Sequence, residues 1–284
     1  MKKIKKILAA NRSEIAIRIF RAAEESGIRT AAIYSKEDRF ALHRFKTDES
    51  YLVGEGKGPI QAYLDINSII DIAKKAGVDA IHPGYGFLSE NPEFADLCEK
   101  NNIIFIGPTP EILSRLGNKT AAKEVADEAG VNTIPSVKVS ESNKNNIHDQ
   151  VNEIGYPVIV KASWGGGGRG MRVVRSADEL SEQIELAQSE SKKAFGKDEV
   201  FIEKFLEDAA HIEVQILGDK HSNIVHLYER DCSLQRRHQK IIERAPAHFL
   251  ESSSRENICA SAVKIAKHVN YCGAGTVEFL YDKK

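Results

Sequence analysis

The N-terminal part of the chain alternates short apolar runs with amphipathic stretches, and this alternation restricts the fold more than any other feature. The apolar runs have the length and composition of buried strands; they read IKKILAA, RTAAIYS, SYLVG, DAIHP and IIFIG. Between them we expect helices that carry Ile15 and Ile19, that span about 66–76, and that begin near Pro92. Repeated strand–helix–strand units predict an α/β fold with a doubly wound, mostly parallel sheet, which binds ligands at the carboxyl ends of its strands.

The first of these helices carries its own start and stop signals. Asn11 and Glu14 have the spacing of a capping box, and Gly27 stands where a helix would end. We therefore expect the Asn11 side chain to cap the helix that follows the first strand.

The second half of the sequence has a different pattern. From Pro110 to Ala129 it is helical with a break at Gly117, and a polar loop, NKNNIHD, is expected near residue 143. A helix follows over 177–194, and another over 255–269. Four strand-like runs lie among them, EVFIEKFL, HIEVQILGD, IVHLYERD and GTVEFLYD, and they predict an α+β region with mostly antiparallel pairing.

Composition excludes several classes of protein. Forty basic residues oppose 41 acidic ones, so the net charge of −1 provides no field that would attract nucleic acid or a membrane. The four cysteines, at positions 98, 232, 259 and 272, have no metal-binding spacing and are typical of reduced thiols, so we expect a cytoplasmic protein. The apolar start stops at Ala10, too early for a signal peptide, and no apolar run approaches the ~20 residues of a membrane span.

A run of four glycines lies between two β-branched runs, in KASWGGGGRGMRVV. A slack linker would have polar flanks, whereas these flanks predict a hairpin whose tip covers a ligand. Glycine N–H groups can approach phosphate oxygens closely, and Lys161 and Arg169 bracket the run with positive charge. The chain has neither a Walker loop nor a G-x-G-x-x-G motif after its first strand, so a phosphate-binding hairpin is the better interpretation.

Polar residues alternate with apolar ones in two of the later strands. In HIEVQILGD, His211, Glu213 and Gln215 occupy the face opposite the isoleucines and valine, and Glu278 lies between apolar neighbours in TVEFLYD. Such glutamates can simply face water, but carboxylates from two strands on one surface also suit Mg²⁺. The cationic stretch ERDCSLQRRHQK can be a solvated loop, yet its mixture of Gln235, His238 and Lys240 after a strand suits recognition of a small anion.

Four motifs in this order resemble the biotin carboxylase branch of the ATP-grasp enzymes: ANRSEIAIRI, HPGYGFLSEN, KASWGGGGRGMRVV and YERDCSLQRRHQKIIERAP. The resemblance covers Ile4 to Asp282, and finer features are most similar to the amino-terminal portion of pyruvate carboxylases. It implies a doubly wound N-terminal domain followed by an ATP-grasp fold with an α+β lid and an incomplete central domain. The implied divisions are 1–117 for the α/β domain, 118–133 for a connecting helix, 134–204 for the lid and 205–284 for the central domain.

The resemblance also implies roles for individual residues. Lys240 is the expected bicarbonate contact and, with His238, a catalytic residue, and Glu278 is the expected magnesium ligand. The glycines are expected at the tip of a lid that closes over ATP. The residues expected to bind ATP are Lys119, Lys161, Gly167, Gly168, Glu203, Lys204, Phe205, Leu206, His211, Gln235, His238, Glu278 and Leu280.

The chemistry implied by the resemblance is phosphoryl transfer from ATP to bicarbonate, which gives carboxyphosphate, and then carboxylation of a biotin ureido nitrogen. Positioning and charge neutralisation dominate such a step, which suits lysines, glycine N–H groups and Mg²⁺ or Mn²⁺. The expected partners are ATP, bicarbonate and a biotinyl carrier domain, in a full-length enzyme that is a homo-oligomer. Members of the family continue beyond the position of Lys284 with a second metal-binding glutamate, so we expect this chain alone to bind nucleotide weakly and not to turn over.

Three functions stay open at this point. The chain can serve a pyruvate or an acyl-CoA carboxylase, it can be another ATP-grasp ligase that phosphorylates a carboxylate, or it can be a nucleotide-binding fragment without catalysis. The stretch QRRHQK argues against the second.

Overall fold

The computed structural model describes residues 3–143, 145–164, 171–236 and 239–282. The chain forms two compact units, Met1–Ser114 and Arg115–Lys284. Each unit has hydrophobic cores of its own.

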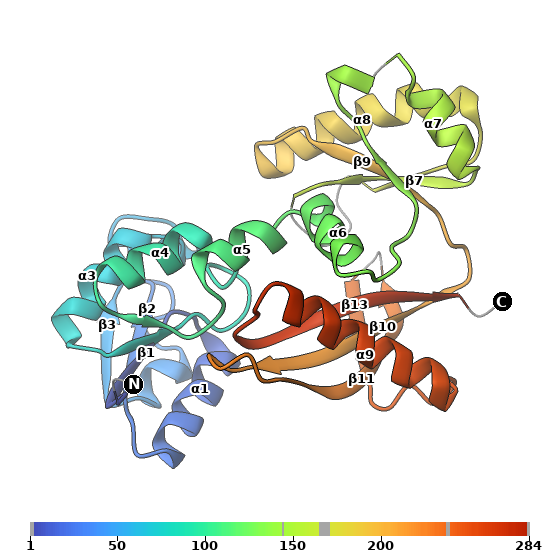
Figure 1. Cartoon of the computed structure of the whole chain (residues 1–284). Helices are drawn as coiled ribbons and strands as arrows, with labels where there is room; N and C mark the ends of the chain where they lie inside the picture. The colour runs from blue at the N-terminus through green and yellow to red at the C-terminus, as the bar shows by residue number, and fades with distance from the viewer. Residues whose placement is uncertain (1–2, 144, 165–170, 237–238, 283–284) are drawn as a thin grey trace. The chain divides into compact units, whose positions relative to one another are not determined.

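The first unit is built on a parallel sheet. Its elements are β1 (Lys6–Ala9), α1 (Ser13–Glu25), β2 (Arg29–Tyr34), the 3₁₀ helix η1 (Leu42–Phe45), β3 (Glu49–Leu52), α2 (Pro59–Tyr63), α3 (Ile66–Ala76), β4 (Ala80–His82), α4 (Pro92–Lys100) and β5 (Ile104–Phe105). The strand order is β3-β2-β1-β4-β5, and every pairing is parallel (Figure 1). The chain leaves this unit within α5 (Pro110–Leu116).

Both faces of this sheet are covered by helices. Leu8 of β1 faces a core that includes residues of α3 and α4, while its neighbours Ile7 and Ala9 face a second core with α1. Successive residues of a strand point to opposite faces, so a strand covered on both sides must be apolar throughout. The expected doubly wound α/β architecture is therefore confirmed.

The expected capping box at α1 is wrong. The residue before α1 is Arg12, and no side chain caps that end of the helix. The Asn11 side chain instead donates from Nδ2 to the carbonyl oxygens of Pro83 and Tyr85, both at 2.8 Å. Asn11 thus ties the carboxyl end of β1 to the loop after β4, a contact between distant residues that local spacing does not reveal.

The second unit contains two antiparallel sheets. Its elements after α5 are α6 (Lys119–Glu128), β6 (Ser136–Lys138), the 3₁₀ helix η2 (Glu141–Asn143), α7 (Ile147–Ile154), β7 (Val158–Ala162), β8 (Arg172–Val174), α8 (Ala177–Phe195), β9 (Val200–Lys204), β10 (Ala209–Gly218), β11 (Ile224–Arg236), β12 (Gln239–Arg244), α9 (Ser252–His268) and β13 (Gly273–Asp282). We call the sheet β6-β9-β7-β8 the hairpin sheet and the sheet β12-β11-β10-β13 the carboxylate sheet.

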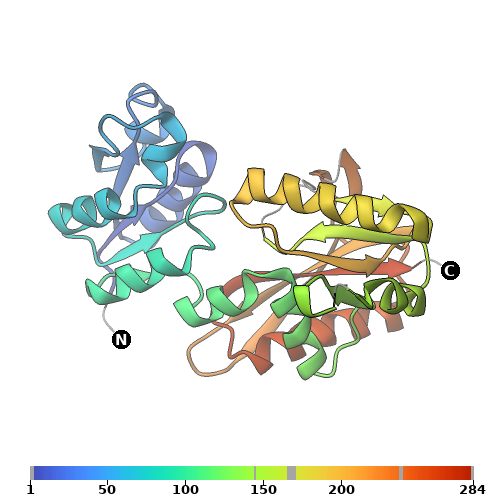
Figure 2. The same cartoon turned by 90° about the horizontal axis from the view of Figure 1, so that it is seen from above.

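Helices cover one face of each sheet. Residues of α7 and α8 pack on the hairpin sheet around Val158, Val160 and Ile202, and Figure 2 shows α8 lying along the strands. In the carboxylate sheet, Val214 and Ile216 of β10 pack against α9. Their neighbours Glu213 and Gln215 therefore lie on the other face, as the alternation in HIEVQILGD predicts.

The expected α+β character of this region is confirmed, with local differences. β7 and β8 pair antiparallel, so the glycine run does connect two strands of a hairpin, although residues 165–170 lie outside the described residues. The stretch expected as a polar loop near residue 143 already enters α7 at Ile147. The stretch ERDCSLQRRHQK does not simply follow a strand: β11 continues to Arg236, and β12 begins at Gln239. No helix within the described ranges is long and apolar enough to cross a membrane.

Candidate functional site

A group of four charged side chains lies on the carboxylate sheet, and we call it the carboxylate cluster: Glu213 of β10, Arg230 of β11, Lys240 of β12 and Glu278 of β13. Glu213 and Glu278 stand directly opposite each other in the pairing of β10 with β13. The Lys240 ammonium contacts both carboxylates, and Arg230 donates from Nε to Glu213 at 3.1 Å and from Nη1 to Gln215 at 3.2 Å.

Charge neutralisation holds this cluster together. Glu213 is only 7% exposed. Burial by itself would raise the pKa of Glu213, but Lys240 and Arg230 outweigh it and hold that pKa below its usual value. Burial likewise opposes the charge on Lys240, yet its two carboxylate partners raise its pKa. Glu213 and Lys240 therefore carry their charges at neutral pH, and Lys240 is a fixed cation beside an accessible carboxylate, since the Glu278 side chain is 63% exposed.

A neighbouring group of possible metal ligands does not suit a metal ion. Ligand atoms of Glu213, Cys232 and Glu243 lie within 4.8 Å of one another. Arg230 is already paired with both carboxylates, and burial raises the pKa of the Cys232 thiol to about 11, which keeps it protonated. A metal ion would have to displace an arginine and deprotonate a buried thiol, so this group is better explained as an ion-pair network.

A second charged group lies on the hairpin sheet, and we call it the lysine cluster: Lys123 of α6, Lys161 of β7 and Glu203 of β9. Glu203 is 6% exposed, and its two carboxylate oxygens accept from Lys123 Nζ at 2.6 Å and from Lys161 Nζ at 2.5 Å. Glu203 faces Ile159 across the pairing of β7 with β9, which makes Lys161 its diagonal neighbour on the same face. Burial would raise the pKa of Glu203, but the two lysines outweigh it and lower that pKa.

The remaining predicted residues occupy positions near these clusters. His211 and Leu280 are partners across β10 and β13, two residues along each strand from Glu213 and Glu278 and therefore on the same face. Gln235 is the partner of Lys240 across β11 and β12. Lys204 donates from Nζ to the carbonyls of Gly155 and Tyr156, at 2.9 and 3.0 Å.

Six predicted positions require separate comment. The Phe205 N–H donates to the Pro157 carbonyl at 3.1 Å, and Leu206 follows it after the end of β9. The backbone N–H of Lys119, the first residue of α6, donates to Ser163 at 3.1 Å. The predicted residues Gly167, Gly168 and His238 lie outside the described residues.

The structure therefore brings Lys240 together with Glu278, and Lys161 together with Glu203. In the described part of the chain, no hydrogen bond or ion pair joins the lysine cluster to the carboxylate cluster. Sequence reasoning missed two residues. Lys123 could have been noticed because it follows Lys119 by four positions and so shares its helix face; Arg230 could not, because its contact with Glu213 depends on the register of two strands.

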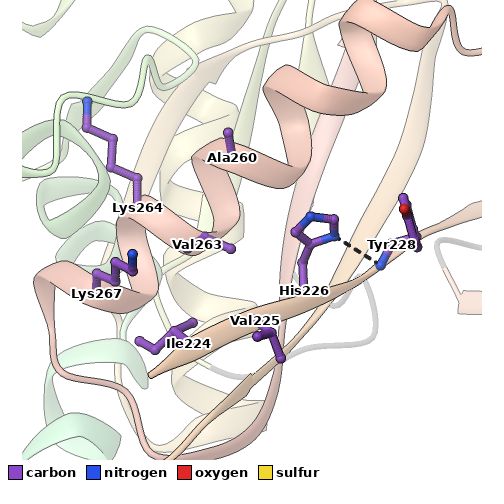
Figure 3. A pocket seen from close by; sticks show the side chains of 8 residues that line it. All are labelled: Ile224, Val225, His226, Tyr228, Ala260, Val263, Lys264 and Lys267. Carbon is purple, nitrogen blue, oxygen red and sulfur yellow. Dashed lines mark hydrogen bonds between the residues drawn. The ribbon is translucent and has the colours of Figure 1, made fainter. Parts of the chain in front are cut away.

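A pocket of about 660 Å³ lies elsewhere in the second unit, between β11 and α9 (Figure 3). Ile224, Val225 and Val263 form its apolar lining, and Lys264 and Lys267 stand on its α9 side. None of the predicted site residues lines it, so it does not contribute to the site described above.

Comparison with known proteins agrees with both units. Residues 3–113 match the family described as "Biotin carboxylase, N-terminal domain", and residues 118–284 match the one described as "Carbamoyl-phosphate synthase L chain, ATP binding domain". Pyruvate carboxylase of Bacillus subtilis is 59% identical over 277 residues, and mitochondrial pyruvate carboxylase of Mus musculus is 54% identical over 282. These regions cover 98% and 99% of this chain but only 24% of each relative.

Solved structures of carboxylases share the fold of this chain. Rhizobium etli pyruvate carboxylase superposes with a TM-score of 0.93 at 55% identity, covering 99% of this chain and 25% of that one. The biotin carboxylase domain dimer of the 2-oxoglutarate carboxylase of Hydrogenobacter thermophilus, in complex with MgADP, ADP and bicarbonate, superposes with a TM-score of 0.94 at 46% identity, covering all of this chain and 62% of that one.

The parallel N-terminal unit, the two antiparallel sheets and these matches define the class: the chain belongs to the biotin carboxylase family of ATP-grasp proteins. Within that family it is similar to the N-terminal portion of pyruvate carboxylases and spans about a quarter of their length, 24% of each curated relative named above. The resemblance inferred from the sequence motifs is thus confirmed.

Proposed function

We propose that this chain carries the ATP and bicarbonate site of a biotin carboxylase, the part of a pyruvate carboxylase that uses ATP to attach bicarbonate carbon to biotin. The observation that carries the proposal is the position of Lys240, whose ammonium lies between the carboxylates of Glu213 and Glu278 on a sheet face. A fixed cation beside an accessible carboxylate suits a small anion and a divalent metal together.

The nucleotide is proposed to lie against the polar groups of both clusters. Lys161 and Lys119 supply positive charge for the phosphates, together with the backbone of Gly167 and Gly168. The segment from Glu203 through Lys204 and Phe205 to Leu206 is proposed to hold the adenine, and its support is that the Lys204 side chain is anchored to two carbonyls. His211, Gln235, His238 and Leu280 complete the proposed nucleotide contacts.

A magnesium ion fits the residues that are present. Mg²⁺ prefers one or two carboxylates together with phosphate oxygens. Glu278 meets this requirement because its side chain is largely exposed while one oxygen is held by Lys240. Bound there, Mg²⁺ or Mn²⁺ would neutralise charge on the ATP phosphates.

The proposed reaction has two steps. A bicarbonate oxygen attacks the γ-phosphorus of ATP, the bond to the β-phosphate oxygen breaks, and ADP leaves with the bonding electrons, so that carboxyphosphate forms. The carboxyl carbon then passes to a ureido nitrogen of biotin, phosphate leaves, and the nitrogen gives up its proton. Lys240 is proposed to hold bicarbonate by its charge, and His238 to act beside it; no nucleophilic side chain is required.

The partners of this chemistry are ATP, bicarbonate and a biotinyl carrier domain, and we propose a homo-oligomer because the Hydrogenobacter thermophilus relative is named as a dimer. The divisions at residues 117, 133 and 204 stay proposals for its domain boundaries. A cytoplasmic location stays a prediction, since the relatives include proteins named as mitochondrial as well as a bacterial one.

The test is formation of ADP by a full-length carboxylase that contains this chain, measured with free biotin, with and without bicarbonate. Bicarbonate-dependent ADP formation supports the proposal. A carbamoyl-phosphate type of activity, suggested by the family matched by residues 118–284, would instead need an ammonia source for sustained turnover. ATP binding without turnover under any condition would favour a nucleotide-binding role alone.

A further inference from the structure

A buried chain of three charges links helix α6 to the hairpin sheet. Lys123 of α6 contacts one oxygen of Glu203, and Lys161 of β7 contacts the other. The exposed fractions of these side chains are 18% for Lys123, 8% for Glu203 and 20% for Lys161. At this burial the charges are weakly screened by water, so removing one of them changes the field at the others.

Lys123 is held in place from more than one side. Its ammonium also donates to the Ile134 carbonyl at 2.5 Å. The C-terminal end of α6 is tied to α9, because His268 bonds to Glu128 at 3.1 Å and Lys264 donates to the Gly130 carbonyl at 3.0 Å. A cation on a helix that is fixed in this way can hold the Glu203 carboxylate in one orientation.

The balance of charge in the lysine cluster decides what Lys161 can bind. Two lysines oppose one carboxylate, which leaves one net positive charge for a ligand. Without Lys123, the charge of Glu203 would be balanced by Lys161 alone, and the Lys161 ammonium would offer much less attraction to a phosphate. The carboxylate would also be free to turn toward Lys161 with both oxygens.

From this arrangement we infer that Lys123 is a positioning residue of the nucleotide site: it holds and neutralises Glu203, and thereby keeps Lys161 directed at, and available to, the nucleotide phosphates. The inference rests on the proposed function, since it takes Lys161 to be a phosphate contact. It concerns the phosphate end of the nucleotide, because Lys123 contacts the side-chain carboxylate of Glu203, whereas the adenine is proposed to contact backbone groups of residues 203–206. No effect on the adenosine end is therefore expected.

The test is displacement of a fluorescent N-methylanthraniloyl ATP from the intact protein by ATP and, separately, by adenosine. Lys123→Met should raise the Kd of ATP about tenfold, the scale of one charge-assisted contact, and leave that of adenosine within about twofold. Lys123→Arg keeps the charge and should restore the Kd of ATP to within about threefold.

The matched control is Lys138→Met. Lys138 of β6 forms an ion pair with Glu124 of α6, so it joins the same helix to the same sheet, but both side chains are more than half exposed. This variant should bind ATP within about twofold of the wild type. A double-mutant cycle adds the second control. In a Glu203→Gln background no carboxylate neutralises the charge of Lys161, so Lys123→Met should weaken ATP binding by less than about twofold.

Each outcome decides something. Lys123→Met that binds ATP as the wild type does overturns the inference, and so does an equal loss for ATP and adenosine, which would mean a purely structural role. If Lys123→Met does not fold by circular dichroism, Lys123→Gln, which keeps a donor for Ile134, replaces it with the same expectations. A wild type that binds no ATP overturns the proposed function and this inference together, whereas an unaffected Lys123→Met beside an ATP-binding wild type overturns the inference alone.

Discussion

Replacing Glu213 with glutamine removes the buried carboxylate that pairs with both Arg230 and Lys240. Removing one partner of a fully buried ion pair costs about 3–5 kcal/mol. Here each cation keeps 27% exposure and at least one further partner, Gln215 and Glu243 for Arg230 and Glu278 for Lys240. We therefore expect Glu213→Gln to lower the free energy of unfolding of the second unit by about 2–3 kcal/mol.

The assay is urea unfolding followed by fluorescence of the single tryptophan, Trp164, which lies in the second unit. The slope of free energy against urea should be unchanged, so that the shift in midpoint reports stability. The matched control is Glu243→Gln, which removes a carboxylate 46% exposed and 3.6 Å from the same arginine. That variant should lose less than about 0.5 kcal/mol. Equal losses of stability in the two variants would show that the buried carboxylate of Glu213 contributes no more than the exposed carboxylate of Glu243, which would refute this explanation.

Three further predictions concern the phosphate site, acid stability and the first unit. Lys161→Ala should weaken ATP binding by about 10- to 150-fold, the value of one charge-assisted hydrogen bond, and unchanged affinity in a calorimetric titration would contradict its assignment. Because the folded pKa values of Glu203 and Glu213 lie below their ordinary value of 4.5, the stability that they contribute is present above about pH 4.5 and is lost as pH falls through the folded values. Urea midpoints measured from pH 7 to pH 3 should therefore fall for the wild type, and fall less for Glu213→Gln. Asn11→Ala leaves two carbonyls without their donor and should speed hydrogen exchange in β1 and β4 by a factor that corresponds to about 1–3 kcal/mol, while Asn101→Ala, which loses one bond within its own helix turn, should have a smaller effect.

The sequence was most informative where a pattern depends on neighbours in the chain. Strand and helix periodicity predicted the doubly wound sheet, and the β-branched flanks of the glycine run predicted the hairpin of β7 and β8. Alternation in HIEVQILGD correctly placed Ile212 and Val214 in hydrophobic clusters on one face of the carboxylate sheet. These features follow from which face of one element is buried, and that information is local.

The sequence was least informative where long-range pairing decides. The Asn11 side chain has the spacing of a helix cap but bonds to carbonyls more than 70 residues away. Arg230 meets Glu213 only because β10 and β11 pair in one particular register. Lys240 reaches two carboxylates because β12 pairs antiparallel with β11, which places Lys240 opposite Gln235. The two isoleucines of β12, Ile241 and Ile242, are adjacent rather than alternating, so the sequence does not distinguish this strand from a solvated loop.

The proposed bicarbonate site can be tested by ADP formation in a full-length carboxylase that contains this chain, with Mg²⁺, ATP and free biotin, in wild type and in Lys240→Met, over a range of bicarbonate concentrations. We expect wild-type ADP formation to rise with bicarbonate, and we expect Lys240→Met to lose this response while it still binds ATP. Wild-type ADP formation that is indifferent to bicarbonate, or a bicarbonate response that Lys240→Met retains in full, would contradict the assignment of this site.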